Sequence, residues 1–392
     1  MTNTFQYAFI LGSHPELSLA ELKAVLNIQA GSESDAQATL THHQQAAFLT
    51  SAKPIDAGAL MERLGGTVKI VELVGDFDEE KLVDWLYKQL NRSSKFHFGF
   101  SLYAVDDGVA LKKHWKTIHQ LGLNLKKALK ADGVSARYVQ SREVALSSVI
   151  VHKERLLKNG VEIVLFKGRD SLRFGKTLAV QPFQDFSRRD YGRPERDHRS
   201  GMLPPKVARM MVNIAQPAPD ATILDPFCGS GTVLQEALLL GFRNVIGSDV
   251  SEKAIDDTSK NLKWLKLPDV PLHVVDVEQI SSVVEPHSVD CVVAEGYLGP
   301  TDPKKMAAAK KELTKLYKNA FATLEKTLKP GGRIIIALPA WKTGSGAQAQ
   351  ITTLPLEPTF KKLNLSHIRK PLFYGRPDAR VVRHLYFLQK AE

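Results

Sequence analysis

The chain has 392 residues, of which 43% are hydrophobic and 24% charged, and this length allows two or three compact cores. That much apolar surface excludes a disordered chain, and no run of about 18 apolar residues is present that could span a membrane. The first residues lack the basic and apolar regions of a secretion signal, so we expect a cytoplasmic protein.

The chain contains two cysteines, Cys228 and Cys291, which are far apart in the sequence. Two cysteines are too few for a disulfide framework or a zinc site. We therefore expect both to be small buried side chains, and we expect no bound metal.

The net charge of +11 is concentrated in one part of the chain. Residues 111–210 contain 22 Lys and Arg against 9 Asp and Glu, whereas the first 80 residues contain 4 against 11. A charge run can be only a solvated surface. Here the basic residues form several separated clusters, which favours a polyanionic partner such as nucleic acid.

Two α+β units are expected in the first half of the chain. Residues 1–75 begin with an apolar strand at 5–11, and Pro15 then opens a helix with its apolar residues on one face. Residues 76–180 contain an expected strand at 96–102 and a basic helix at 121–130. Residues 181–202 are rich in Arg, Asp, Pro and Gly, and we expect a linker there.

Residues 203–392 change to short apolar strands that alternate with helices. This pattern predicts a parallel sheet with helices on both faces, a doubly wound α/β domain. The expected strands are 222–224, 244–247, 272–275, 289–293 and 333–338. Ligands of such domains bind beyond the carboxyl ends of the strands, where the strand order reverses.

A glycine-rich turn at residues 225–232 follows the first of these strands. Its glycines let the backbone turn tightly and approach a ligand closely. No Gly-Lys-Ser/Thr follows, so it is not a phosphate loop, and the third glycine of a dinucleotide fingerprint is missing. Asp225 would repel a pyrophosphate and suits a cationic ligand, such as S-adenosylmethionine with its ammonium and sulfonium groups.

Two further acids stand at the ends of the next two strands. Asp249 can accept hydrogen bonds from both ribose hydroxyls, and Asp276 is placed to meet an adenine edge. Either acid could instead be only a helix N-cap. Three acids at three successive strand ends favour a shared site. The residues expected to contact the cofactor are Asp225, Phe227, Gly229, Ser230, Gly231, Thr232, Asp249, Val250, Asp276 and Val277.

The turn at 225–232, with Glu236-Ala237 after it, resembles the first motif of class I amino-methyltransferases that act on nucleic acid. The fuller resemblance is to the THUMP-domain tRNA guanosine N2-methyltransferase group, which methylates guanosine at position ten of tRNA. Three further segments carry it, 11–22, 191–213 and 375–388, so it spans nearly the whole chain and is densest from 181 to 300.

The resemblance implies a ferredoxin-like module at 1–75, a THUMP-like RNA-binding domain at 76–180 and a Rossmann-like methyltransferase domain at 203–392. It also implies S-adenosylmethionine as the cofactor and tRNA or another structured RNA as the partner, with no membrane involved. The sequence does not reveal whether a protein subunit is also required.

The fourth strand ends in a loop, Glu295-Gly296-Tyr297-Leu298-Gly299-Pro300, that departs from the family pattern of an acid, two prolines and an aromatic. We expect Glu295 and the Gly296 carbonyl to accept hydrogen bonds from the target amine, and Tyr297 to stack on the base. The other possibility is that Glu295 is merely solvated and Tyr297 packs under the loop. Both prolines are missing, which leaves room for another acceptor such as an adenine N6.

Five arginines, Arg188, Arg189, Arg193, Arg196 and Arg199, are expected to line an RNA path to the active site, although a linker kept soluble by charge would look the same. Two other functions stay open. One is a DNA amino-methyltransferase acting on adenine N6 or cytosine N4, because the Gly-Ser-Gly-Thr turn is shared with such enzymes. The other is a catalytically impaired RNA-binding protein that still holds S-adenosylmethionine.

Overall fold

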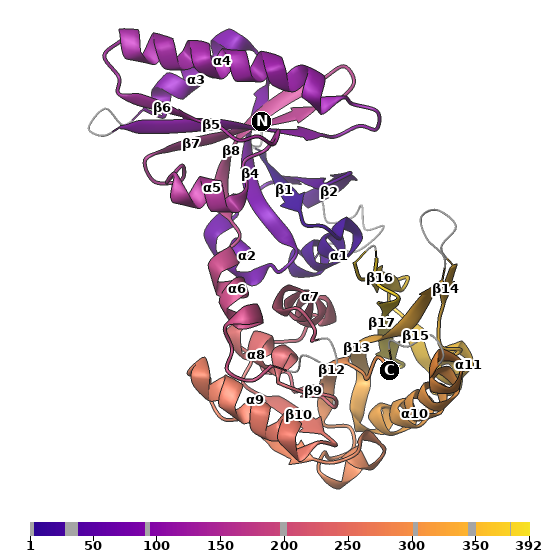
Figure 1. Cartoon of the computed structure of the whole chain (residues 1–392). Coiled ribbons are helices and arrows are strands. Elements are labelled where there is room, and N and C mark those ends of the chain that lie inside the picture. The colour runs from indigo at the N-terminus through magenta and orange to yellow at the C-terminus, as the bar shows by residue number, and fades with distance from the viewer. Residues whose placement is uncertain are drawn as a thin grey trace. The chain divides into compact units, whose positions relative to one another are not determined.

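The computed structural model describes residues 4–27, 38–90, 95–196, 202–300, 305–343, 350–376 and 378–392. Its Cα positions form two compact units, Met1–Asp185 and Phe186–Glu392, each of which is built on one sheet (Figure 1). Among the described residues, no helix is both long and apolar enough to cross a membrane.

The N-terminal unit is built on one eight-stranded sheet in the order β2-β3-β1-β4-β8-β7-β5-β6. Its strands are β1 (Phe5–Leu11), β2 (Ala38–His43), β3 (Ala46–Ser51), β4 (Thr67–Asp76), β5 (Phe96–Ala104), β6 (Ala136–Val139), β7 (Gly160–Lys167) and β8 (Leu172–Val180). Its helices are α1 (Pro15–Val25), α2 (Ala57–Arg63), α3 (Glu79–Lys88), α4 (Leu111–Ala131) and α5 (Ser148–Lys153). Helices α3 and α4 pack on the apolar face of β5 that carries Phe96, Phe98 and Phe100.

The sheet joins the two modules that the sequence separated at residue 75. That boundary falls inside β4, which pairs with β1 on one side and with β8 on the other. A fully buried ion pair between Lys69 of β4 and Glu162 of β7 spans the same junction, and Glu162 also accepts the hydroxyls of Ser101 and Thr177. A module cut at residue 75 would leave these buried charges unpaired, which is costly.

Two other expectations differ from the structure. The expected linker contains helix α6 (Phe183–Tyr191). The basic helix expected from residue 121 begins ten residues earlier, at Leu111, because Ile118 continues the apolar spacing of Leu121 and Leu125 toward the N-terminus.

The C-terminal unit contains a nine-stranded sheet in the order β11-β10-β9-β12-β13-β17-β15, with β14 paired to β13 and β16 paired to β17. Its strands are β9 (Ile223–Asp225), β10 (Val245–Asp249), β11 (Leu272–Val274), β12 (Val289–Glu295), β13 (Leu328–Thr343), β14 (Gln350–Thr352), β15 (Leu365–His367), β16 (Leu372–Tyr374) and β17 (Val381–Lys390). The five expected strands are confirmed, with shifted ends, and those from β11 to β13 are parallel.

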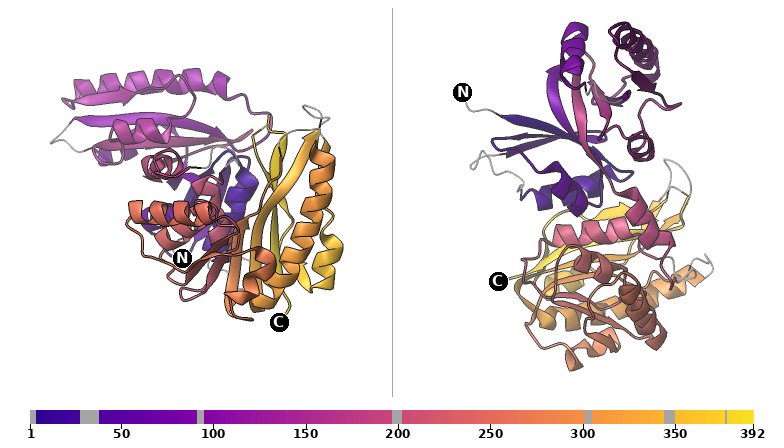
Figure 2. Two further views of the ribbon diagram at one scale, coloured as in Figure 1. Left: turned by 60° about the horizontal axis from the view of Figure 1, so that its bottom comes forward. Right: turned by 90° about the vertical axis from the view of Figure 1, so that its left-hand side faces the viewer.

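Helices cover both faces of this sheet, as Figures 1 and 2 show. They are α7 (Pro205–Ala215), α8 (Thr232–Leu239), α9 (Glu252–Trp264), the 3-10 helix η1 (Val277–Ser282), α10 (Met306–Thr327) and α11 (Glu357–Lys362). Helices α10 and α11 pack on the face of β12 and β13 that carries Val292 and Ile334. The chain runs from β9 outward through β10 and β11, then returns to β12 on the other side of β9. The strand order therefore reverses between β9 and β12, and a ligand is expected there.

Candidate functional site

The turn after β9 is shaped by two glycines in the left-handed region, Gly229 at φ +52° and Gly231 at φ +83°. A Cβ on Gly231 would lie 2.9 Å from a side-chain carbon of Thr258, so a larger residue would not fit. The Gly229 amide donates to a carboxylate oxygen of Asp249 at 3.0 Å. The turn after β9 is thereby fixed to the end of β10.

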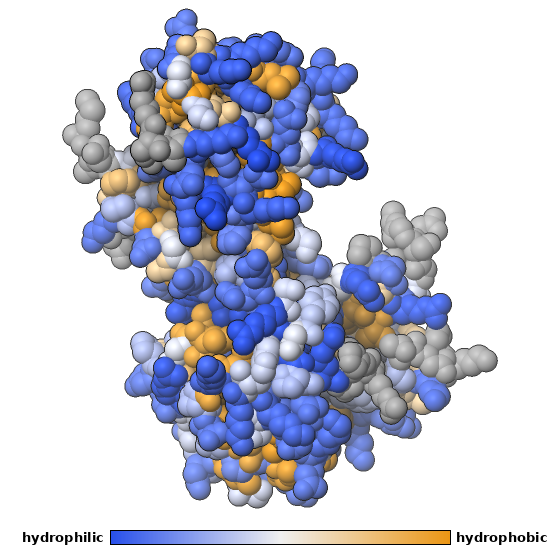
Figure 3. Space-filling model, turned by 60° about the vertical axis from the view of Figure 1, so that its left-hand side comes forward, coloured by the Kyte–Doolittle hydropathy of each residue, from blue (hydrophilic) through white to orange (hydrophobic). Residues whose placement is uncertain are grey.

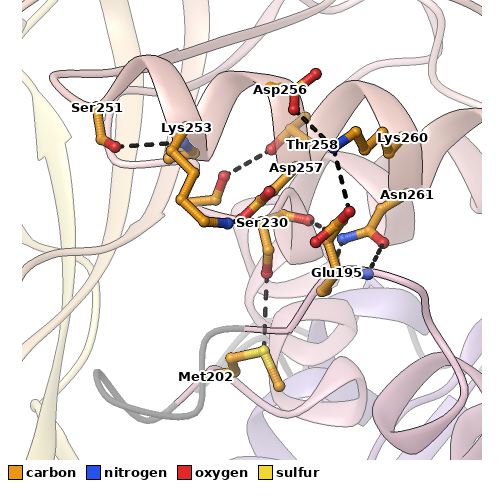
Figure 4. Close-up of polar contacts among 12 residues, drawn as sticks. Glu195, Met202, Ser230, Ser251, Lys253, Asp256, Asp257, Thr258, Lys260 and Asn261 are labelled. Atoms are coloured by element: carbon orange, nitrogen blue, oxygen red, sulfur yellow. Dashed lines mark hydrogen bonds and ion pairs between the residues drawn. The ribbon is translucent and has the colours of Figure 1, made fainter.

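Helix α9 also holds this turn, and Figure 4 shows its side chains Thr258 and Asn261 near Ser230. The Thr258 hydroxyl donates to the Gly229 carbonyl at 2.7 Å, and the Asn261 amide donates to the Ser230 carbonyl at 2.9 Å. Asn261 also exchanges hydrogen bonds with the backbone of Glu195. The backbone of the turn is therefore fixed in place by polar side chains of α9.

A cavity of about 1000 Å³ opens at the carboxyl ends of the parallel strands. Four acids from four strand ends line it: Asp225, Asp249, Asp276 and Glu295. The expected convergence of three acids is therefore present, and the fourth acid joins them. All the other residues expected at the cofactor except Gly231 also line it, namely Phe227, Gly229, Ser230, Thr232, Val250 and Val277.

Asp225 is the most deeply buried of the four acids, with 2% of its surface exposed. One of its oxygens accepts the Phe227 amide at 3.1 Å. Burial raises the pKa of Asp225 well above its ordinary value, and the charges of Asp249 and Glu295 raise it further. A cation bound beside this carboxyl would relieve that unfavourable environment, so the cavity favours a positively charged ligand.

Asp249 and Asp276 each bind backbone amides as well as lining the cavity. Asp249 accepts the amides of Gly229 and Ser251, at 3.0 and 2.9 Å. Asp276 is the N-cap of η1 and accepts the Glu278 amide at 2.8 Å, so the capping role considered from the sequence is real for this residue. A carboxylate has about four lone-pair sites, and both acids therefore keep acceptor capacity for a ligand.

The loop after Glu295 is held by Tyr317 of α10. A Cβ on Gly296 would lie 2.5 Å from the Tyr317 hydroxyl oxygen, and that hydroxyl donates to the Tyr297 carbonyl at 2.6 Å. Tyr317 therefore restrains a loop that lacks the family's two prolines. The Tyr297 side chain does not pack under the loop, because it lines the cavity with 56% of its surface exposed.

Glu295 has a partner that the sequence did not indicate, Arg383 of β17. The two side chains form an ion pair and are 15% and 14% exposed. Burial raises the pKa of the Glu295 carboxyl, and Arg383 opposes that rise. The partners stand 88 residues apart, so no local pattern connects them.

Two of the five arginines expected to contact RNA are buried instead. Arg189 is 7% exposed and donates to Glu236 at 2.6 Å, and Arg209 donates to the other oxygen of Glu236 at 2.7 Å. Arg193 is 3% exposed and donates to the Thr232 hydroxyl at 2.7 Å. The expectation for Arg189 and Arg193 is corrected: a fully buried Glu236 requires cations around it, and these residues are not available to a partner.

The other three arginines differ in their surroundings. Arg188 is exposed and lies over the Trp264 ring at 4.9 Å. Arg196 lines the cavity and lies over the Tyr191 ring at 5.5 Å. Arg199 is outside the described residues. Within the described part of the chain, no group of three or more His, Cys, Asp or Glu could hold a metal ion.

Residues 193–346 match the RMKL-like methyltransferase domain family, and residues 76–260 match a family described as DNA methylase. The fold and the cavity thus define a methyltransferase domain of the class that uses S-adenosylmethionine, as the sequence predicted.

Curated proteins of similar sequence indicate which methyltransferases the chain resembles. The tRNA (guanine(10)-N2)-dimethyltransferase of Pyrococcus abyssi is 26% identical over 85% of this chain and 88% of its own length. The enzyme of the same name from Methanothermobacter thermautotrophicus is 32% identical over 36% of this chain and 39% of its own. The chain is similar to the tRNA (guanine(10)-N2)-dimethyltransferases, and the resemblance stated from the sequence is confirmed.

The solved structure of TrmN from Thermus thermophilus resembles the whole chain in fold. The match covers 99% of this chain and 100% of TrmN, with a TM-score of 0.54 and 17% sequence identity. At that identity the likeness concerns the fold alone.

Proposed function

We propose that the protein transfers a methyl group from S-adenosylmethionine to the exocyclic N2 amine of a guanosine in tRNA. The observation that carries this proposal is the meeting of four strand-end acids in one cavity, with the exposed Tyr297 ring on its wall. The cavity volume of about 1000 Å³ lies at the upper end of the usual range for ligand sites. It is large enough for a cofactor and part of a substrate.

The residues of the cavity fit this cofactor. Asp225 would face its cationic end, Asp249 the ribose hydroxyls, and Asp276 with Val277 the adenine, while Phe227 and the exposed Val250 give apolar walls. The backbone of Gly229 to Thr232 would lie against it without obstruction. When bound, S-adenosylmethionine supplies an electrophilic methyl group on a sulfonium.

Glu295, Gly296 and Tyr297 would bind the acceptor. The exocyclic amine of guanine is conjugated with its ring and is a weak nucleophile. When Glu295 and the Gly296 carbonyl accept its two hydrogens, the nitrogen lone pair is localised and faces the methyl group. The nitrogen would then gain the methyl carbon as the carbon–sulfur bond breaks and its electron pair stays on the sulfur, and one proton would pass along the hydrogen bond to Glu295. Tyr297 stacks on the base, which has to leave its helix to reach the cavity.

Helix α4 supplies a surface for the RNA backbone in the N-terminal unit, which we infer contains ferredoxin-like and THUMP-like parts. At about 100° per residue its lysines fall within an arc of about 140°, and all are exposed: Lys112, Lys113, Lys116, Lys126, Lys127 and Lys130. The helix contains no Asp or Glu. In Figure 3, hydrophilic side chains cover most of the face shown, and apolar ones form small separate areas. The exposed lysines of α4 suit phosphates better than an apolar partner.

The match to a DNA methylase family supports one second candidate, methylation of DNA. It shares the cofactor site with the first and differs in the acceptor, which would be adenine N6 or cytosine N4. The loop after Glu295 lacks the two prolines of the family pattern, which supports a third candidate, a protein that binds RNA and cofactor without catalysis. Against this candidate, Tyr317 restrains the loop where the prolines would have done so.

The test is incubation of the purified chain with labelled S-adenosylmethionine and unmodified bulk tRNA, followed by nucleoside analysis of the product. We expect label in N2-methylated guanosine, and we expect unlabelled tRNA to compete better than duplex DNA. Label in DNA bases, or cofactor binding without label in any nucleic acid, would favour the second or third candidate. Activity of the chain alone would show that no partner subunit is needed. Its cytoplasmic location remains a prediction.

A further inference from the structure

We propose that Arg383 is a positioning residue for methyl transfer: it turns one oxygen of Glu295 toward itself and thereby presents the other oxygen to the acceptor amine. This inference rests on the proposed function, because it assigns Glu295 to the acceptor.

The geometry lets Arg383 act on the cavity through Glu295. Glu295 ends β12 and pairs with Ala337 of β13, and Arg383 of β17 pairs with Pro339 on the other side of the same strand. The Arg383 side chain therefore reaches across β13, and its Nε donates to Oε1 of Glu295. Arg383 does not line the cavity, whereas Glu295 does.

Arg383 is itself held in a fixed orientation. Its Nη2 donates to the Met202 carbonyl at 3.2 Å, just before α7, and its guanidinium lies 5.8 Å from the centre of the Tyr374 ring. These contacts come from two different segments of the chain. A planar guanidinium held in this way fixes the carboxylate plane of its partner, which a flexible lysine does less well.

The second oxygen of Glu295, Oε2, accepts no hydrogen bond from the described residues. It is the oxygen left for a substrate hydrogen. Three other titratable groups interact with Glu295: Asp225 of β9, Tyr317 of α10 and Tyr374 of β16. Among these four groups around Glu295, Arg383 is the one cation. Asp225 is an acid, so its negative charge would oppose the ionised form of Glu295.

Charge at this site has a direct chemical consequence. A protonated Glu295 would offer an O–H where the amine needs an acceptor. Without Arg383, burial and the nearby Asp225 would favour the protonated form. Arg383 thus has two effects, since it orients the carboxylate and opposes the rise of its pKa that burial causes.

The experiment compares Arg383→Gln and Arg383→Lys with the wild type, at saturating tRNA and cofactor, across a range of pH. For Arg383→Gln we expect kcat to fall about a hundredfold, KM for tRNA to change less than threefold, and the acid limb of the kcat profile to move up by about one pH unit. Arg383→Lys should restore the position of the acid limb and part of kcat. Arg243→Gln removes an equal charge from an exposed residue ahead of β10, and it should match the wild type.

The pKa of Glu295 in the free protein gives a readout that does not depend on catalysis. Carboxyl-labelled glutamate, with the signal assigned from Glu295→Gln, should show a higher pKa in Arg383→Gln than in the wild type. An unchanged pKa and an unchanged pH profile would overturn the inference. So would a loss of kcat that lysine does not restore and that leaves the profile in place. An inactive wild type would refute the proposed function instead, and the pKa comparison would still decide the role of Arg383.

Discussion

The lysine surface of α4 and the acidic cavity of the C-terminal unit use charge in opposite ways. The lysines are all exposed, and each can add one weak contact to a polyanion that salt screens. Asp225 and Glu295 are largely buried, and each makes specific contacts with a small number of named groups. Attraction to RNA can therefore be spread over many interchangeable residues, whereas chemistry on one amine depends on a few that cannot be exchanged.

The largest effect on activity is expected from substitutions of Glu295, in the acidic cavity. Glu295→Ala removes the proposed acceptor for the target amine, so we expect kcat to fall by about a thousandfold while affinity for S-adenosylhomocysteine changes less than twofold. Turnover on tRNA and calorimetry with S-adenosylhomocysteine measure the two effects. Because Ala leaves Arg383 without its ion-pair partner, Glu295→Gln is the companion variant, and it should lose activity without losing stability. Wild-type turnover in both would remove Glu295 from the mechanism.

The buried arginines should behave as part of the fold and not as part of the RNA surface. Arg189→Gln leaves the buried Glu236 with one cation fewer, so we expect the free energy of unfolding to fall by about 3 kcal/mol. The exposed Arg188→Gln is the control, and its effect should stay within about 0.5 kcal/mol. Urea denaturation measures both. If Arg189→Gln instead kept its stability and weakened tRNA binding, the assignment of Arg189 to the interior would be wrong.

Each substitution on the lysine surface of α4 should weaken tRNA binding only slightly, which is the smallest effect per residue among these predictions. Four substitutions to Gln, at Lys112, Lys116, Lys127 and Lys130, should weaken tRNA binding about tenfold at physiological salt and lower the salt slope by about three. The control changes four lysines of α10 at positions 311, 315, 318 and 326 in the same way. Filter binding across a salt series measures the slopes. Equal slopes for the two variants would show that α4 has no special place in RNA binding.

The sequence was sufficient to predict that three acids meet at one cavity. Apolar runs ended at Asp225, Asp249 and Asp276, and the carboxyl ends of parallel strands meet at one edge of a sheet. These signals are local, since each consists of a short strand and the residue that follows it.

What the sequence could not give depends on contacts between distant segments. The ion pair of Glu295 with Arg383 crosses a strand between them, and the hydrogen bond from Tyr317 to the Tyr297 carbonyl joins a helix to a loop. Arg189 stands in a stretch with the composition of a solvated linker, and its burial follows from Glu236, which is 47 residues away. The boundary expected at residue 75 falls inside β4, which pairs with strands from both sides of it, and no local pattern indicates that pairing.

The most direct test of the account is the affinity for S-adenosylmethionine of the wild type and of Asp225→Asn, measured by calorimetry. Asp220→Asn, which makes the same change of charge on an exposed residue ahead of β9, is the matched control. We expect Asp225→Asn to weaken binding by about tenfold or more and Asp220→Asn to leave it unchanged. Equal affinities in all three proteins would mean that the cationic cofactor does not bind among the strand-end acids.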